Sequence, residues 1–324
     1  MSQATEQTVS EPRVVALVLN YNGLEVTLKT LASLSELSYG AIDLVVVDNG
    51  STDGSWDAVA EAFPAVHQIK VEQNQGISHG MNDGLRYAAA GAWDYVLILN
   101  NDIEVAPDMV TEMVAVAERD PKIGAVGPKA FYYWDRERLW STGGILRFKH
   151  SVTRERGDGE LDHGQYDRDE EVPYVNGCAM LVRRQALLDT GLWDSTYFLG
   201  VEDADWCMRM KRLGYTCWYA HKAVLWHMIS HSTGVYKPGR TFQTGRSTAI
   251  FVRKFAGPLQ WAGFLFFTAL SLPAAFLREL PKGNARAAVS KFQGLLDGMK
   301  VPLGTKNLSL DPSSTFTEDI GAAS

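Results

Sequence analysis

The sequence contains few cysteines, and none of them is spaced for a metal site. Its 324 residues include three, Cys178, Cys207 and Cys217. An odd number of widely spaced thiols does not form the disulfide framework of small secreted domains, and no CxxC pair is present to bind zinc. We therefore expect reduced thiols and a cytoplasmic protein.

An excess of basic residues is also missing. The chain has 31 Lys and Arg against 38 Asp and Glu, which gives a net charge of −7 at pH 7. Nucleic-acid-binding domains normally carry a basic face, so we expect no nucleic-acid partner. The polar residues 1–11 have neither the basic start nor the apolar run of a secretory signal, and we expect residues 1–12 to be a disordered lead-in.

The glycine-rich phosphate loops of two large enzyme classes are absent. After the first predicted strand the sequence reads Asn20-Tyr-Asn-Gly23. This is neither the GxGxxG of dinucleotide-binding folds nor a P-loop. Its absence argues against an NAD-dependent dehydrogenase and against an NTPase.

Apolar, β-branched runs alternate with helical patterns over the first hundred residues. Amphipathic helices are predicted from about residue 22, from 55 to 63 and from 78 to 90, the first of them capped by Asn22 and Glu25. Strands alternating with helices indicate βαβ units, and hence an α/β fold with a mostly parallel sheet. The predicted strands are Val14–Asn20, Asp43–Asn49, His67–Glu72 and Tyr95–Asn100.

The pattern is less regular beyond residue 102. We expect helices at 107–119, 184–190 and about 203–213, ordered chain at 172–181, and an exposed loop at 154–171, which is dense in charge and glycine. Residues 234–245 hold several glycines, and we expect this stretch to be a loop that closes over a bound ligand. The polar residues 306–324 are predicted to be a disordered tail.

A long uncharged stretch marks the C-terminal region. Residues 259–277 contain no charged side chain, which is close to the length that spans a bilayer, although Gln260 and Pro273 weaken that reading. Residues 278–300 are basic and amphipathic. Three arrangements stay open: an interfacial helix pair, a helical subdomain packed on the core, and a true span. Contact with a membrane surface through residues 257–300 is the favoured one.

The triplet Asn100-Asn101-Asp102 follows the fourth predicted strand directly. Ligands of open α/β sheets bind beyond the carboxyl ends of the strands. In extended chain, Asn100 and Asp102 project to the same side. Their oxygens suit a hard divalent cation such as Mg²⁺ or Mn²⁺, the usual partner of a nucleoside diphosphate.

Two further loops could hold a nucleotide. Asp48 ends the second predicted strand, where its carboxylate could accept the N3–H of a uracil or thymine ring. The alternative is a strand–turn–helix junction with no ligand. The loop from Asn74 to Gly84 holds three glycines that would let its backbone approach a nucleotide, and its alternative is a glycine-rich helix entry.

Acidic residues and a histidine complete the candidates. Glu202-Asp-Ala-Asp205 opens a predicted helix, where one carboxylate could deprotonate an acceptor hydroxyl, or all three could simply complement the helix dipole. His227 ends a short strand-like run. Alone it is a structural histidine, but with Asp102 it is a candidate ligand of Mn²⁺.

These motifs give the chain a clear resemblance. It resembles the family 2 glycosyltransferases of the GT-A fold, in the branch of bacterial rhamnosyltransferases and mycobacterial galactofuranosyltransferases. The motifs occur in the order of that family and cover about residues 13–234. They are Val47-Asp-Asn-Gly-Ser-Thr-Asp-Gly-Ser55, Asn74-Gln-Gly76 with Asn82-Asp-Gly84, Leu99-Asn-Asn-Asp-Ile103, Glu202-Asp-Ala-Asp-Trp-Cys-Met-Arg209 and Trp226-His-Met228.

The resemblance implies an inverting transfer and a role for each site residue. Asp203 matches the catalytic base, Asp102 and His227 match the metal ligands, and Asp48 matches the nucleobase contact. Many relatives carry Asp where this chain has Asn100 or Asn101, so its metal site has less negative charge. We place in the donor site Asn20, Asp48, Asn49, Asn74, Gly76, Asn100, Asn101 and Arg246. We place in the acceptor site Asn176, Gly177, Trp193, Asp194, Glu202 and Asp205.

The expected organisation is a GT-A domain at residues 13–235 and a helical, membrane-contacting region at 236–305. The expected activity is metal-dependent transfer of a sugar, with a rhamnosyl-like group favoured, from a dTDP- or UDP-sugar to a glycan or lipid-linked acceptor. The alternatives are an inactive sugar-nucleotide-binding protein and a sugar nucleotidyltransferase. We expect the protein at the cytoplasmic face of a membrane. The sugar, the acceptor and the oligomeric state are left open.

Overall fold

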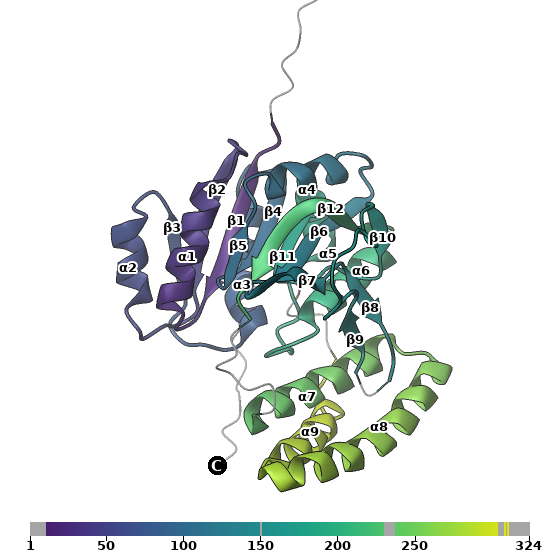
Figure 1. Ribbon diagram of the computed structural model, residues 1–324. Coiled ribbons are helices and arrows are strands. Elements are labelled where there is room, and N and C mark those ends of the chain that lie inside the picture. The colour runs from purple at the N-terminus through teal and green to yellow at the C-terminus, as the bar shows by residue number, and fades with distance from the viewer. Residues whose placement is uncertain (1–10, 150, 230–236, 304–307, 309, 311–324) are drawn as a thin grey trace, which may run out of the picture.

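The computed structural model describes residues 11–149, 151–229, 237–303, 308 and 310, and within them ten strands form one mixed sheet (Figure 1). The strands follow the order β10-β12-β6-β11-β4-β1-β2-β3, with β5 paired to β12 and β7 paired to β6. A separate hairpin joins β8 and β9. The strands are β1 Val14–Asn20, β2 Ile42–Asp48, β3 His67–Lys70, β4 Tyr95–Asn100, β5 Ile103–Val105, β6 Ile123–Tyr132, β7 Asp135–Ser141, β8 Gly144–Leu146, β9 Thr153–Glu155, β10 Glu170–Val172, β11 Ala179–Arg183 and β12 Thr216–His227.

The first four strands are all parallel, in the order β3-β2-β1-β4. The continuous aliphatic runs of β1 and β4 are buried on both faces, as expected for central strands of a parallel sheet covered by helices, while β3 at the sheet edge is partly exposed. The register pairs Asn20 with Asp48, and Leu19 with Asn100. The carboxyl ends of three strands therefore meet at one edge, and the predicted α/β fold is confirmed.

The second half of the sheet brings a distant strand to that edge. β11 runs antiparallel between β4 and β6, and β12 lies parallel to β6. β12 therefore ends at the same edge as β1, β2 and β4. β5 pairs with β12 in antiparallel register, with Ile103 opposite His227. This pairing places the residue before Ile103 beside the end of β12.

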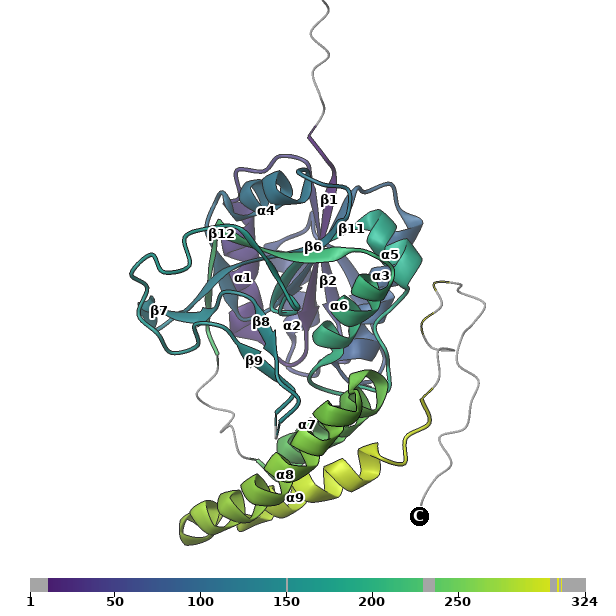
Figure 2. The ribbon, with the colours of Figure 1, turned by 90° about the vertical axis from the view of Figure 1, so that its right-hand side faces the viewer.

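Helices cover both faces of the sheet (Figure 2). Helices α1, α2 and α4 share one hydrophobic cluster with the sheet, and α3, α5, α6, α7 and α9 contribute to the other. The helices are α1 Leu24–Ser35, α2 Ser55–Ala62, α3 Ile77–Ala90, α4 Met109–Ala117, α5 Arg184–Thr190, α6 Glu202–Arg212, α7 Pro238–Phe255, α8 Pro258–Glu279 and α9 Ala285–Gly298, with a 3-10 turn at Leu280–Lys282.

The start of α1 differs from the predicted cap. Gly23 is the N-cap residue and makes no side-chain capping bond. Asp53 Oδ2 accepts the backbone N–H of Leu24 at 2.9 Å, while Asn22 Oδ1 accepts the N–H of Thr52 at 2.8 Å. The predicted Asn22–Glu25 cap is wrong, because a carboxylate from the following loop satisfies the first turn instead.

The charged segment 154–171 is also more ordered than predicted. It contributes the end of β9 and the start of β10. Within it, Asp162 Oδ2 lies 2.9 Å from Nζ of the buried Lys129, and Asp167 Oδ1 lies 2.5 Å from the same nitrogen. A buried cation requires such partners. Most of the segment is exposed loop as predicted, and Asp162 and Asp167 anchor it to Lys129.

Helices α7, α8 and α9 form a layer beneath the sheet (Figures 1 and 2). α7 and α9 touch through their backbones: a Cβ added at Gly294 would lie 2.0 Å from the Phe242 carbonyl oxygen, and one at Gly245 would lie 2.2 Å from that of Lys291. Only glycine permits this approach. Residues 238–245 belong to α7, so the predicted loop is wrong there, and residues 234–236 lie outside the described chain.

Candidate active site

Asn20 connects the ends of three strands at the carboxyl edge of the sheet. Its Nδ2 donates to Asp48 Oδ2 at 2.9 Å and to Ser55 Oγ at 2.8 Å. Its Oδ1 accepts from Asn101 Nδ2 at 3.0 Å and from Thr27 at 2.9 Å. The side chains of Asn20 and Asn101 are therefore hydrogen-bonded to each other, which holds the ends of the strands together. Donor contact by either side chain stays a prediction.

Asp48 is almost completely buried, with 1% of its surface exposed. Besides the bond from Asn20, its Oδ1 accepts the N–H of Ser51 at 2.8 Å, which closes the turn after β2. The carboxylate therefore stabilises the turn between β2 and α2. A carboxylate has about four acceptor positions, so a further bond from a nucleobase N–H remains open to it as a prediction.

The loop before α3 packs tightly against the turn after β2. Asn49 Nδ2 donates to Asn74 Oδ1 and to the Gly76 carbonyl, both at 3.2 Å, while its buried Oδ1 has no hydrogen-bond partner. Gly76 has φ of 106°, and a Cβ there would lie 2.7 Å from the Phe198 carbonyl oxygen. The glycine is required by both backbone and packing, and Asn49 carries an unused acceptor.

The triplet after β4 alternates as predicted. The Asn100 side chain bonds to Asp102, and the Asn101 side chain points the other way, to Asn20 and Thr27. Asp102 Oδ1 lies 3.0 Å from His227 Nε2, and the Trp140 ring packs edge-on against the imidazole with centroids 4.4 Å apart. Burial alone would raise the pKa of Asp102, but the bond and charge of His227 outweigh it and lower that pKa.

Asp102 and His227 fit a divalent cation. Asp102 Oδ1 and His227 Nε2 lie 3.0 Å apart, close enough to bind one cation in place of the proton that they share. Although burial lowers it, the charges and hydrogen bonds of Cys178 and Asp102 raise the pKa of His227 to about 10, so a cation would displace that proton on binding. Such O and N donors suit Mn²⁺, and the oxygen suits Mg²⁺. Among the described residues no group of three or more His, Cys, Asp and Glu side chains is placed to hold a metal. The protein would therefore supply two ligands and leave the others to the donor and to water.

The Glu-Asp pair lies at the start of α6, next to the end of the sheet. Val201, its N-cap residue, has φ of 67° and ψ of 6°. A left-handed conformation is rare for a β-branched residue, and such strain gathers at functional sites. Asp203 Oδ2 accepts the N–H of Gly177 at 2.9 Å, and Oδ1 accepts the N–H of Ala204 at 2.7 Å. The base predicted from the sequence is therefore held in one orientation.

Burial raises the pKa of both Glu202 and Asp203. Burial and the Asp203 charge raise the pKa of Glu202 to about 8, and its Oε2 has no hydrogen-bond partner. Burial also raises the pKa of Asp203, against the effect of its two backbone N–H donors. With this pKa Glu202 holds a proton near pH 7, and Asp203 is the carboxylate that two backbone N–H groups orient.

Asp194 and Asp205 have a different place from the one predicted. Lys254 of α7 reaches both carboxylates, with its Nζ 2.8 Å from Asp194 Oδ2. Asp205 also accepts from Arg209 Nε at 2.8 Å and from Tyr197 at 3.1 Å, and it is fully buried. The two carboxylates fasten α7 to the chain around α6. Acceptor binding by either one stays a prediction that this burial does not support.

The other predicted acceptor residues lie around Asp203. Asn176 uses its whole amide internally: Nδ2 donates to Glu155 Oε1 at 3.0 Å and Oδ1 accepts from Cys178 N at 2.8 Å. The buried Trp193 lies behind Gly177, where an added Cβ would meet its ring at 3.3 Å. Gly177 therefore contributes its N–H to Asp203, and Trp193 forms the wall behind them.

Glu155 was missed by the sequence analysis. It ends β9 and accepts from Ser141 at 2.5 Å, from Tyr174 at 2.8 Å and from Asn176. Burial raises its pKa, and the nearby Asp203 charge raises it further. The only signal was a pair of short apolar runs, 144–146 and 152–153, on either side of a polar turn. That pattern is too short to distinguish a hairpin from a loop.

Arg246 lies on α7 and is occupied within the C-terminal layer. Its Nε is 2.9 Å from Asp297 Oδ2, and its Nη1 donates to the Thr196 carbonyl. Contact with a diphosphate would require these bonds to open. That contact stays a prediction.

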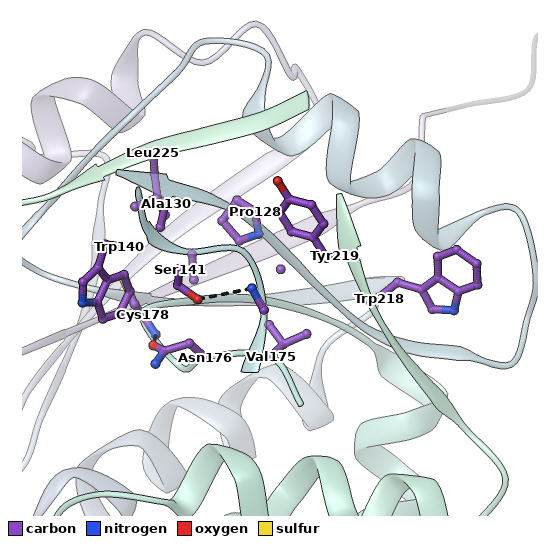
Figure 3. Close-up of a pocket in the computed structure, with 13 residues that line it drawn as sticks. Pro128, Ala130, Trp140, Ser141, Val175, Asn176, Cys178, Trp218, Tyr219 and Leu225 are labelled. Carbon is purple, nitrogen blue, oxygen red and sulfur yellow. Dashed lines mark hydrogen bonds between the residues drawn. The ribbon is translucent and has the colours of Figure 1, made fainter. Parts of the chain in front are cut away.

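A small cavity is lined by Trp140, Asn176 and Cys178 among others (Figure 3). Its volume is about 20 Å³, and Ser141 Oγ lines it while accepting the N–H of Gly143 at 3.3 Å. This space holds about one water molecule. It is too small for a sugar.

The mixed, mostly parallel sheet with helices on both faces is the α/β architecture of the GT-A fold. Residues 16–191 match the model of Glycosyl transferase family 2, and the chain belongs to that family. It is therefore a glycosyltransferase that uses a nucleotide-sugar donor.

Relatives and solved structures agree with this assignment. The chain is 27% identical over 253 residues to N-acetylglucosaminyl-diphospho-decaprenol L-rhamnosyltransferase of Mycobacterium tuberculosis, covering 71% of this chain and 82% of the relative. It is 24% identical over 221 residues to poly-beta-1,6-N-acetyl-D-glucosamine synthase of Staphylococcus epidermidis, and there it spans 67% of this chain but only 50% of the relative.

Two solved structures share the fold. One is the mannosyltransferase PcManGT from Pyrobaculum calidifontis in complex with GDP-Man and Mn²⁺, with a TM-score of 0.57, 20% identity, and coverage of 93% of this chain and 88% of the other. The second is GalNAc-T7 with UDP, GalNAc and Mn²⁺, with a TM-score of 0.59, 14% identity, and coverage of 74% and 48%.

Proposed function

We propose that this protein is an inverting, metal-dependent glycosyltransferase that extends a glycan on a lipid carrier. The donor is a dTDP- or UDP-sugar, and a rhamnosyl-like hexosyl group is favoured. The observation that carries the proposal is the position of Asp203: a buried carboxylate, oriented by Gly177, at the same edge of the sheet as Asp48 and the Asp102–His227 pair.

The residues divide between donor and acceptor. The Asp48 carboxylate and the unpaired Asn49 Oδ1 would accept hydrogen bonds from the nucleobase and the ribose of the donor. Asp102 and His227 would hold a divalent cation, which when bound neutralises charge on the diphosphate leaving group. The named substrates of the relatives support this division: one is a rhamnosyltransferase, and a structural neighbour binds GDP-Man and Mn²⁺.

Asp203 acts on the acceptor. Its carboxylate takes the proton of the acceptor hydroxyl as that oxygen bonds to the anomeric carbon. The bond from this carbon to the diphosphate oxygen breaks on the opposite face, and the nucleoside diphosphate leaves with the electron pair. One displacement inverts the anomeric configuration. Protonated Glu202 keeps a second negative charge away from the base.

Two observations support a lipid carrier. The mycobacterial relative is named for an acceptor on diphospho-decaprenol. This chain also carries an exposed apolar helix, since α8 with its following turn, Pro258–Lys282, is long and apolar enough to cross a membrane. We therefore place the protein at the cytoplasmic face of a membrane, where it meets a lipid-linked acceptor.

Calorimetric titration tests the donor site first. UDP, dTDP and GDP are titrated into the protein with Mn²⁺ and again with EDTA. Binding of UDP or dTDP in Mn²⁺ alone supports the proposal, and absence of binding in both conditions contradicts it. NMR of the product then reads the anomeric configuration, and retention would contradict a single displacement.

A further inference from the structure

The exposed side of α8 is more apolar than the side that packs against the rest of the protein. The inner face carries Thr268 and Ser271, close to the buried Phe264. A surface helix in water has the opposite arrangement. Between residues 258 and 277 every exposed position except Gln260 is apolar: Pro258, Leu259, Ala262, Leu265, Phe266, Ala269, Leu270, Pro273, Ala274, Phe276 and Leu277.

Helix α9 continues this surface. Its exposed apolar side chains recur at helical spacing, and they are Val289, Phe292, Leu296 and Met299. A groove of about 370 Å³ runs between the two helices, lined by Ala269, Leu272, Pro273 and Phe276 of α8 and by Ala288, Val289 and Phe292 of α9. We call these exposed residues of α8 and α9, with the groove, the outer face. An apolar patch of this kind marks an interaction surface.

Basic residues predominate around the outer face. Residues 237–303 contain ten Lys and Arg against two acidic residues. Of these, Arg278 and Lys282 pair with Glu279, Arg246 pairs with Asp297, and Lys254 pairs with Asp194 and Asp205 outside this range. Arg286 and Lys300 are exposed and flank the row of exposed apolar side chains on α9. The partner must therefore combine hydrocarbon with negative charge.

The inner side of α8 is attached to the rest of the protein. Phe264 is buried in the main hydrophobic cluster. Lys149 lies at the tip of the β8–β9 hairpin, and its Nζ is 4.8 Å from the centroid of the Phe267 ring. The ring centroids of Phe148 and of Phe251 in α7 are 6.0 Å apart. A spanning helix would lose these contacts, because lipid would surround it. α8 is thus arranged to lie along a surface.

We propose that the outer face docks onto an anionic bilayer, with α8 and α9 lying in the interface. The apolar side chains and the groove take up acyl chains, and the basic residues meet lipid phosphates. A second copy of this chain fits less well, because two outer faces would bring together two predominantly basic regions. The proposal concerns this surface alone and does not depend on the donor site.

Vesicle flotation of the full chain tests this proposal. The vesicles are pure phosphatidylcholine in one series and contain one third phosphatidylglycerol in the other, at low and high salt. We expect flotation with the anionic vesicles, weakened by salt. Failure to float with anionic vesicles, or equal flotation with both compositions, overturns it. A fraction that resists both high salt and alkaline carbonate also overturns it, since that marks a span.

The variant that tests the outer face is Leu270→Glu in α8. Its matched control is Leu213→Glu at the end of α6. The two leucines are 58% and 55% exposed, so either change costs the fold little. We expect Leu270→Glu to reduce partition into anionic vesicles at least tenfold, with Leu213→Glu unchanged and both melting as the wild type does. Equal partition of the two variants contradicts the proposal. So does a wild-type dimer that Leu270→Glu dissociates, because the outer face would then join two copies.

Discussion

Asp102 and His227 stand 125 residues apart in the chain, yet Oδ1 of one lies 3.0 Å from Nε2 of the other. The antiparallel register of β5 and β12 produces this approach, since it sets Ile103 opposite His227. The Met228 N–H also donates to the Asp102 carbonyl at 2.8 Å, which locks the two segments together. Backbone pairing therefore brings the two side chains together.

Replacement of His227 tests the cation site. We expect His227→Gln to weaken Mn²⁺-dependent binding of UDP or dTDP about tenfold or more, toward the level in EDTA, because one of two protein ligands is lost. Calorimetry measures this. The control is His221→Gln, which removes another carboxylate-bound imidazole, 2.6 Å from Asp169. Equal loss in the two variants would speak against the assignment.

Asp203→Asn tests the base. The amide conserves shape but cannot take a proton, so we expect the rate of transfer to fall by about 10² to 10⁴ while the donor Kd stays within twofold or so. Single-turnover assays and calorimetry measure the two quantities. Full turnover in this variant would move the base to another carboxylate.

The stability of the protein should depend on Glu202. Its pKa is about 8 in the folded protein, against an ordinary value of 4.5. Because the folded state binds the proton more tightly than the unfolded state, this group stabilises the fold fully below pH 4.5 and loses that contribution as pH rises toward 8. We expect urea unfolding to show a free energy that falls over this range, and Glu202→Gln to flatten the fall. An identical pH dependence in the two proteins would refute the shift.

Lys254 should matter more than other lysines on the surface. Lys254→Met leaves Asp194 and Asp205 buried without their shared cation, which we expect to cost about 3–5 kcal/mol of unfolding free energy. Lys211→Met is the control, because Lys211 meets the half-exposed Glu171 at 3.0 Å, and such a pair is worth about 1 kcal/mol or less. Denaturant unfolding distinguishes them. Similar losses would show that Lys254 makes no special contribution.

The fold and the order of the site motifs could be predicted because they depend on local patterns. The buried run Tyr95–Asn100 predicts a parallel strand, and the spacing of Asn100 and Asp102 predicts that both side chains share one side. The structure confirms both, with Asn101 directed the opposite way to Asn20.

What could not be predicted depends on long-range contacts. The cap of α1 comes from Asp53, in a loop that follows the next strand. The acidic residues Asp194 and Asp205 have Lys254 as their partner, which lies 60 and 49 residues further along the chain. Composition near a carboxylate cannot reveal whether a cation or a sugar will meet it. Glu155 was missed for the same reason, because Asn176 and Tyr174 become its neighbours only when β9 folds back.

The β8–β9 hairpin has two attachments. At its base, Glu155 holds the amide of Asn176, one residue before the Gly177 that orients Asp203. At its tip, Phe148 and Lys149 rest on α7 and α8. The hairpin therefore connects the C-terminal helical layer with the loop that orients Asp203. Because β8 and β9 form a sheet of their own, this connection runs outside the main sheet.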